Sequence, residues 1–168
     1  MACTLCNEGD IARTQGHPEH AATLLLEARR RYIEANNQLG EAETLYTLSK
    51  VETALGRCKS AEKCLEDALV LARAVGIARL LGPTLWSLGE YRVRWGDVEA
   101  AESAFAEALE IYKASGNREA QAGILAGLSS VAWRKDDFSA SLEYLVPRQN
   151  LWVKLRSQGT RSGEVTSA

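Results

Sequence analysis

The feature that most constrains the fold is a repeat of forty residues. Leucine recurs at this interval, and so does a turn residue; the leucines are Leu5, Leu45, Leu85 and Leu125, and the turn residues are Gly16, Gly56, Gly96 and Asp136. The interval holds from copy to copy without an insertion. Self-similarity at a fixed period of about 20–50 residues is typical of arrays in which each unit buries its apolar face on its neighbours. The sequence therefore predicts a chain that acts as a surface to hold another molecule.

Each copy contains two stretches of helical periodicity separated by a tight turn. In the third copy, Leu85, Leu88 and Tyr91 lie on one helix face. Gly96 then breaks the pattern, and a second apolar stripe follows from about Val98. Two helices joined by a short turn pack against each other in an antiparallel manner. We therefore expect an all-α fold of about four antiparallel helical hairpins.

The period also predicts the limits of the units. The repeats cover about residues 2–37, 38–77, 78–117 and 118–157, which together form one array over 1–157. Residues 158–168 are small and polar, and we expect a disordered tail there.

Several residues mark the ends of the expected helices. Asn36, Gly76 and Gly116 share one column, and all three suit the left-handed conformation that ends a helix. Pro83 falls a few residues into the first helix of the third copy, so it marks either the start of that helix or a kink. Pro147 interrupts the last helix, which we expect to bend or to restart there.

Composition and charge exclude several classes of protein. The formal net charge of −2 gives no electrostatic reason to expect binding to nucleic acid or to an anionic membrane. The first ten residues lack the apolar stretch of a signal peptide, and no run of 18 apolar residues occurs. We expect a soluble cytoplasmic protein with four reduced cysteines.

A run of three arginines, Arg29-Arg30-Arg31, is a local exception to the balanced charge. Glu27 and Glu34 lie within one helical turn of it, so we interpret the run as a solvated and partly paired helix face. A nuclear-import or phosphate-binding role is the alternative.

Metal and catalytic sites have little support in the sequence. Cys3, Cys6, His17 and His20 do not have the spacing of compact zinc sites, and the repeat already explains both cysteines as helix residues. A nucleophile needs a base within hydrogen-bond reach, and both histidines lie in one turn between helices. We expect no enzyme, no metal and no cofactor.

The columns of the repeat resemble those of the tetratricopeptide repeat. The third copy matches the family pattern best, with Leu85 in the tryptophan-type column, then Leu88-Gly89, Gly96-Asp97, Ala101, Phe105 and Ala108. The forty-residue period is similar to that of the long-helix subclass in kinesin light chains and in the tetratricopeptide arms of signalling NTPases. The resemblance implies a right-handed superhelical solenoid. No phosphate-binding loop of the GxxxxGK[ST] type is present, so the chain contains no NTPase domain.

In this family the first helix of each repeat lines a concave groove that binds partners. Carried over column by column, the resemblance gives ten partner-binding candidates, which are Asn7, Asp10, Arg13, Tyr46, Lys50, Trp86, Glu90, Arg94, Trp133 and Arg134. Aromatic and arginine side chains are enriched at the centres of protein interfaces. Tyr46 and Trp86 have a second interpretation, in which they only cover neighbouring helices. The clamp that some family members use for a chaperone's C-terminal peptide is absent, because Cys6 and Asp10 stand where Lys and Asn are expected.

The sequence therefore predicts a protein-interaction scaffold that holds a partner peptide or helix in its concave groove. One alternative is a regulatory or sensor arm that binds a small ligand or an effector. Another is an array that associates with itself through the last hairpin. That hairpin is crowded with apolar residues, namely Phe138, Leu142, Tyr144, Leu145, Leu151 and Trp152, some of which would remain exposed for a missing neighbour.

Overall fold

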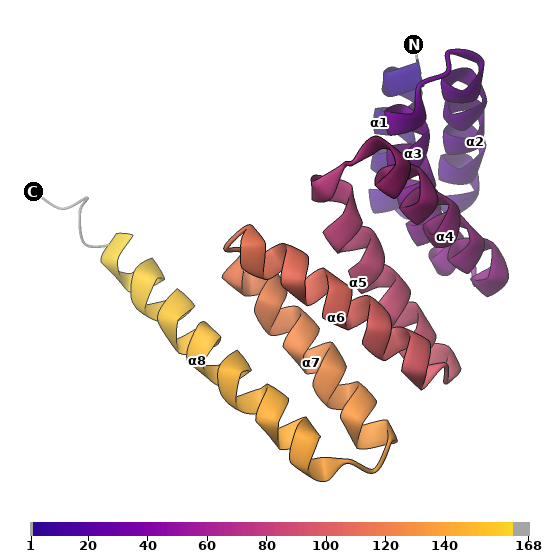
Figure 1. The fold of residues 1–168 in the computed structure, drawn as a ribbon. Coiled ribbons are helices and arrows are strands. Elements are labelled where there is room, and N and C mark those ends of the chain that lie inside the picture. The colour runs from indigo at the N-terminus through magenta and orange to yellow at the C-terminus, as the bar shows by residue number, and fades with distance from the viewer. Residues whose placement is uncertain (1, 163–168) are drawn as a thin grey trace, which may run out of the picture. The chain divides into compact units, whose positions relative to one another are not determined.

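The computed structural model describes the backbone of residues 2–162 and the side chains of residues 2–150. This part of the chain contains eight helices and no strand. The helices are α1 (Ala2–Thr14), α2 (Pro18–Glu34), α3 (Gln38–Ala54), α4 (Cys58–Val75), α5 (Ala78–Trp95), α6 (Val98–Ala114), α7 (Arg118–Arg134) and α8 (Phe138–Ser162). They follow one another as antiparallel hairpins (Figure 1). The expectation of an all-α fold of four hairpins is confirmed.

The helix limits repeat with the period of the sequence. The first helices of the last three hairpins begin at Gln38, Ala78 and Arg118. The second helices begin at Pro18, Cys58, Val98 and Phe138. Each series advances by the same forty residues, so the columns of the sequence are structurally equivalent positions.

Left-handed residues end the helices where the columns predicted them. Asn36 has a φ angle of 51° and Asp136 of 60°, and the remaining residues with positive φ among those described are glycines. Asn and Asp tolerate this conformation better than other residues with a side chain, because their short polar groups can bond to the local backbone. Asp136 therefore turns the chain in the fourth hairpin as glycine does in the first three.

Polar side chains begin four of the helices. Asn37, Asp97, Asn117 and Asp137 each accept a hydrogen bond from the backbone N–H three residues later, at 2.9, 3.2, 3.1 and 2.9 Å. Such a bond satisfies one of the free N–H groups at a helix start. Asn37 and Asn117 thus fix turns between hairpins, and Asp97 and Asp137 fix turns within a hairpin.

The chain divides into two compact units, residues 1–84 and 85–168. In the first unit, α1 packs on α2 and α3 on α4, and α3 also contacts α1 and α2. Leu25 of α2 is fully buried in a cluster with Leu45, Leu48 and Val51 of α3. The second hairpin is thus attached to the first through the apolar face of α3.

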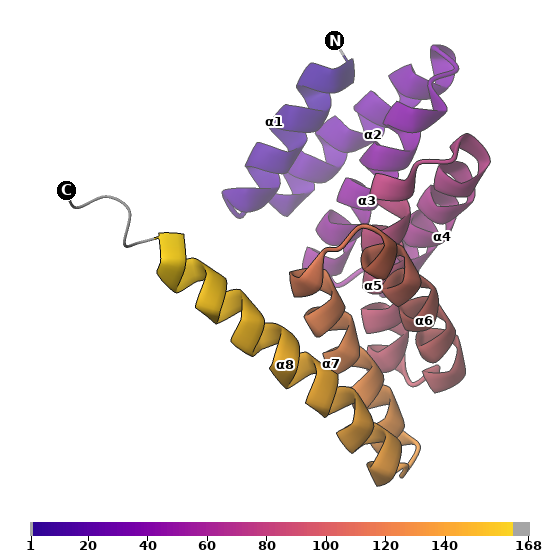
Figure 2. The same ribbon diagram turned by 60° about the vertical axis from the view of Figure 1, so that its left-hand side comes forward.

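In the second unit, α6 packs on α7 and α7 on α8, and Figure 2 shows α7 and α8 side by side. Phe105 of α6 is 1% exposed and lies against two glycines on different helices. A Cβ atom at Gly89 of α5 would lie 2.7 Å from its ring, and one at Gly127 of α7 would lie 2.6 Å away. The ring therefore touches the backbones of α5 and α7 directly.

Both prolines lie inside continuous helices, which corrects part of the expectation. Helix α5 begins at Ala78 and not at Pro83, and α8 passes through Pro147 without a restart. A proline inside a helix removes the hydrogen bond to the carbonyl four residues earlier. That carbonyl belongs to Arg79 in α5 and to Glu143 in α8, and both of these residues are exposed, so water can replace the bond.

The end of α8 overlaps the tail that the sequence predicts. The helix includes residues 158–162 of the segment expected to be disordered, and residues 163–168 lie outside the described part of the chain.

We predict that Gly89→Ala destabilises the second unit. Alanine is favoured over glycine in a helix by about 1 kcal/mol, but the new methyl group would overlap the buried ring of Phe105. Overpacking of this kind costs about 1–3 kcal/mol. Urea unfolding monitored by circular dichroism measures the change.

The control is the same substitution in a Phe105→Leu background. In the second repeat, Ser49 and Leu65 occupy these two columns, so a leucine is compatible with a Cβ atom there. Gly89→Ala should therefore cost less in the Phe105→Leu background than in the natural chain. An equal or higher stability of the Gly89→Ala single variant would contradict this account of the packing.

Candidate functional site

The first helices of the first unit line a polar hollow of about 300 Å³. Four of the ten candidate residues, Asn7, Asp10, Arg13 and Lys50, lie on its wall. Helix α1 supplies the first three and α3 supplies the last, because positions three or four residues apart face the same side of a helix. The structure thus brings together, on one hollow, four candidates that the repeat columns placed on the first helices.

Two of these side chains have defined contacts. Arg13 and Asp10 form an ion pair at 2.8 Å on the surface of α1. The Nζ atom of Lys50 lies 4.2 Å from the centre of the Tyr46 ring, where a cation is attracted to the ring face. Tyr46 is partly buried and packs against the core of this unit, so it serves both interpretations given to it by the sequence. The hollow therefore offers an ion pair on α1 and a supported cation on α3.

Residues that are not among the ten candidates complete the lining of the hollow. Tyr32 of α2 and Glu43 of α3 line it together with Cys3 and Cys6. Burial raises the pKa of Tyr32 to about 12, and repulsion from the thiols of Cys6 and Cys3 adds to the effect. The phenol is therefore protonated at neutral pH and can donate a hydrogen bond. The sequence signal was Gly40, whose missing Cβ would lie 2.4 Å from the Tyr32 ring.

A partly buried hydrogen bond joins α1 and α3 among the residues that line the same hollow. The Sγ atom of Cys6 and the Oγ1 atom of Thr44 are 3.0 Å apart, and the Thr44 hydroxyl also donates to the carbonyl of Gly40 at 2.7 Å. Cys6 is thereby placed between two helices as a structural contact.

In the second unit, α5 carries three candidates, of which Trp86 is packed against neighbouring helices, whereas Glu90 and Arg94 are exposed. Trp86 is partly buried, meets the Tyr112 ring edge to face at 6.4 Å, and lies where a Cβ atom of Gly123 would be 2.6 Å away. This position favours its second interpretation, the covering of a neighbouring helix. Glu90 and Arg94 are exposed and have no ion pair within the described part of the chain.

The remaining candidates, Trp133 and Arg134, line a groove of about 680 Å³ between the ends of α7 and α8. The Trp133 ring meets Phe138 edge to face with centroids 4.9 Å apart. Phe138 and Leu142 of α8 continue the wall, so the groove is mainly apolar. The sequence identified the two α8 residues as crowded apolar groups but did not place them beside Trp133 and Arg134.

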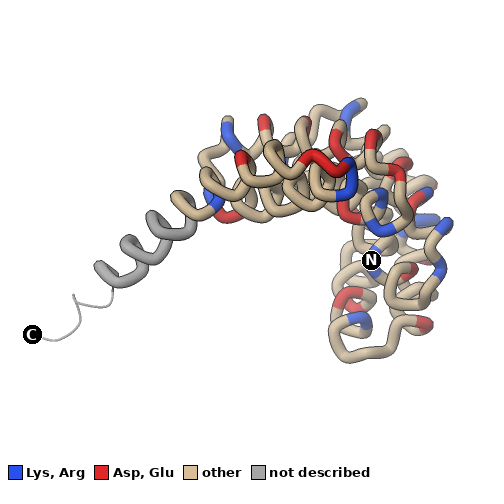
Figure 3. Tube along the Cα trace, turned by 90° about the horizontal axis from the view of Figure 1, so that it is seen from below, with Lys and Arg blue, Asp and Glu red and all other residues tan. Residues whose placement is uncertain are grey.

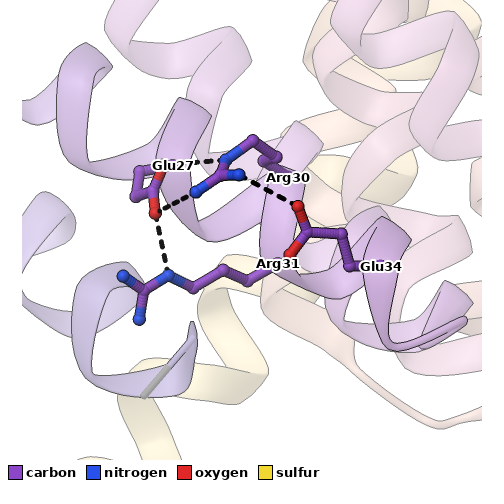
Figure 4. Close-up of polar contacts among 4 residues, drawn as sticks. All are labelled: Glu27, Arg30, Arg31 and Glu34. Atoms are coloured by element: carbon purple, nitrogen blue, oxygen red, sulfur yellow. Dashed lines mark hydrogen bonds and ion pairs between the residues drawn. The ribbon is translucent and has the colours of Figure 1, made fainter.

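The arginine run is paired, as the sequence indicated. Arg30 bonds to Glu27 at 2.8 Å and to Glu34 at 3.0 Å, and Arg31 bonds to Glu27 at 2.9 Å (Figure 4). Arg29 bonds to Glu41 at 3.3 Å. Each guanidinium therefore has a carboxylate partner already, and an anion would have to displace it.

Residues of both charge signs are scattered over the described helices (Figure 3). Among these residues, no three His, Cys, Asp or Glu side chains gather as they would around a metal ion. Within the same range, no helix has the length and apolar character needed to cross a membrane.

Comparisons with known proteins agree with this geometry. The family model described as tetratricopeptide repeat matches residues 1–74. No curated protein sequence matches the chain.

The fold is similar to those of several solved structures. BtubC (BKLC) from P. vanneervenii has a TM-score of 0.84 at 15% identity, over 92% of this chain and 64% of its own. Aspartyl phosphate phosphatase F from Bacillus subtilis has a TM-score of 0.81 at 14% identity, over 98% of this chain and 41% of its own. A Podosopora anserina putative kinesin light chain with TPR-like repeats has a TM-score of 0.54 at 11% identity, over 90% and 95% of the two chains. The chain thus spans less than two thirds of the first two of these proteins, and at these identities the likeness concerns the fold.

The Glu27 cluster generates a prediction on pH. Hydrogen bonds from Arg30 and then from Arg31 lower the pKa of Glu27 from 4.5 to about 2. A carboxylate whose pKa is lowered by folding stabilises the folded state above its ordinary pKa, and this contribution disappears as the pH falls towards the folded value. The urea midpoint of the natural chain should therefore fall more between pH 7 and pH 3 than that of Glu27→Gln.

Glu8→Gln is the control, because it removes one exposed carboxylate that has no ion pair within the described residues. It should keep the pH dependence of the natural chain. Identical pH dependence for Glu27→Gln and the natural chain would rule out the stabilising cluster.

Proposed function

We propose a function for this chain from the family to which it belongs, the tetratricopeptide repeat proteins, whose helical hairpins generally form protein-interaction modules without catalysis. The proposed function is that of a scaffold or adaptor that binds a segment of a partner protein on its first helices. The four cysteines are free thiols, in accord with a reducing compartment such as the cytoplasm.

The observation that carries the proposal is the polar hollow of the first unit. Its wall combines hydrogen-bond donors and acceptors, from Asn7, Thr47 and Tyr32, with charges of both signs, from Asp10 and Lys50. A site for a single anion would need mainly cations and N–H groups. A peptide backbone needs both donors and acceptors, since each residue except proline carries one N–H and one C=O. The hollow therefore suits a peptide segment.

The first helices hold charged groups exposed in positions where binding costs little side-chain entropy. Lys50 is exposed, and its one described contact is with the Tyr46 ring. The ring holds the lysine stem in place, so less side-chain freedom is lost when the ammonium group meets a partner. In the second unit, Glu90 and Arg94 are similarly exposed on α5 and extend the proposed set of binding residues.

Selection from a displayed library of random twelve-residue peptides tests the proposal. Peptides enriched on the natural chain are measured against Lys50→Ala by fluorescence anisotropy. The substitution removes a cation from the hollow, and interface residues of this kind contribute about 1 kcal/mol or more, so we expect an affinity loss of about tenfold.

Lys59→Ala is the matched control, because it removes one exposed lysine from α4, a second helix that does not line the hollow. It should leave the affinity unchanged. Equal affinities of the selected peptides for the natural chain and for both variants would contradict binding on the first helices. A selection that enriches no peptide would favour the alternative of a regulatory arm for a small ligand.

A further inference from the structure

The groove between α7 and α8 exposes large apolar side chains. Trp133 is 62% exposed, Phe138 51% and Leu142 64%, and Leu145 is partly exposed beside them. A gathered patch of this kind on a soluble helical hairpin marks an interaction site more often than scattered single residues do. All four side chains line the groove.

The same surface is covered in the earlier hairpins. Leu25 and Phe105 occupy the column of Leu145, and both are buried. Helix α3 covers Leu25 in the first unit, and α7 covers Phe105 in the second. The α7–α8 groove is therefore the continuation of an interface at which this chain already accepts a helix.

In one column the groove differs from the α6–α7 interface and is similar to the α2–α3 interface. Glu102 of α6 bonds to Lys135, which follows α7. In the first unit, Ala22 occupies the column of Glu102 and Leu55 the column of Lys135. Ala22 lies in an apolar cluster, and Leu55 packs against that cluster. Leu142 takes this column in the last hairpin, so the end of an incoming helix would meet an apolar surface there, and not a carboxylate.

Charge further limits the occupant. Arg134 is the one charged residue in the lining of the groove, which contains no carboxylate. It has no ion pair within the described part of the chain. An occupant with a carboxylate at its edge would supply one.

The first helix of a second copy of this chain is a poor occupant. Leu48 of α3 is buried against the preceding hairpin, and Glu8 is its equivalent on α1. Insertion of α1 into the groove would place this carboxylate on an apolar surface, which is unfavourable unless it is paired. The occupant is therefore another helix.

We propose that the α7–α8 groove binds an amphipathic, acidic α-helix of a partner protein, in the position that a following first helix would take. The helix places apolar residues on Leu145 and Leu142 and a carboxylate beside Arg134. This proposal is independent of the peptide site in the first unit, which lies on other residues.

Two peptides with the sequences of this chain's own first helices serve as probes. Residues 38–55 carry Glu41, Glu43, Glu52 and Lys50, a net charge of 1 − 3 = −2, and end in Leu55. Residues 118–135 carry Arg118, Arg134, Lys135 and Glu119, a net charge of 3 − 1 = +2, and end in Lys135. Both are made with blocked termini and a fluorescent label, and binding to the natural chain is followed by anisotropy.

The proposal predicts saturable binding of the 38–55 peptide and an affinity at least about tenfold weaker for the 118–135 peptide. Leu142→Glu should weaken the binding of the 38–55 peptide by about tenfold or more, because the apolar contact at this column is lost. The position is exposed, so the variant should keep the fold, which circular dichroism verifies. Val70→Glu is the matched control, since Val70 is 66% exposed on α4, and it should bind as the natural chain does.

Three results would overturn the proposal. One is the absence of saturable binding, and another is equal binding by the natural chain and Leu142→Glu. The third comes from sedimentation equilibrium without peptide: a natural chain that dimerises, with a monomeric Leu142→Glu variant, would show that a second copy occupies the groove. A natural chain that stays monomeric supports the partner helix.

Discussion

In the first and third hairpins a large side chain of the second helix packs against a glycine of the first helix, and the spacing of these helices depends on this contact. In the second unit the contact extends to the next hairpin, because Phe105 meets the backbones of both α5 and α7. In the first unit Leu25 lies where a Cβ atom of Gly9 would be 2.8 Å away. Side chains buried between helices tolerate little change in volume. Helices can therefore pack at a constant distance from hairpin to hairpin only if one of these two columns keeps a large residue and the other a small one.

Most of the fold was predictable from the sequence for the same reason. The glycine columns that contain Gly56 and Gly76 predict the ends of helices, because a helix commonly ends at a residue in the left-handed conformation, and both glycines have positive φ. The effect of Pro147 was not predictable from the local rule. A proline costs one backbone hydrogen bond, and whether a helix breaks depends on packing against its neighbour and on access of water to the freed carbonyl. Helix α8 packs on α7, the freed carbonyl belongs to the exposed residue Glu143, and the helix continues through Pro147.

The candidate site was predictable only in part. The period indicates which side of a helix a residue occupies, and Asn7, Asp10 and Lys50, which the repeat columns grouped, line the same hollow. It could not tell how far a side chain from another helix reaches, and for this reason Tyr32 was missed. The period placed Trp86 in the groove, but it could not show that the large Trp86 ring reaches a neighbouring helix. The ring lies on the backbone of α7 at Gly123. Periodicity gives direction, whereas the partners of a side chain depend on its length and on the size of its neighbours.

The two exposed faces of the outermost helices differ in character, and this difference has a consequence for assembly. The α1 face carries Glu8 where its equivalents carry leucine, whereas the α8 face carries Leu142 where two of its three equivalents, Glu62 and Glu102, carry glutamate. A stack with two complementary apolar ends would add copies head to tail and grow into a filament unless the ring closed. With a carboxylate on the α1 face and an apolar surface on the α8 face, the two faces are not complementary, so head-to-tail addition of copies is unfavourable. Glu8 therefore lets the apolar α8 face remain open to a partner while it disfavours polymerisation of the chain.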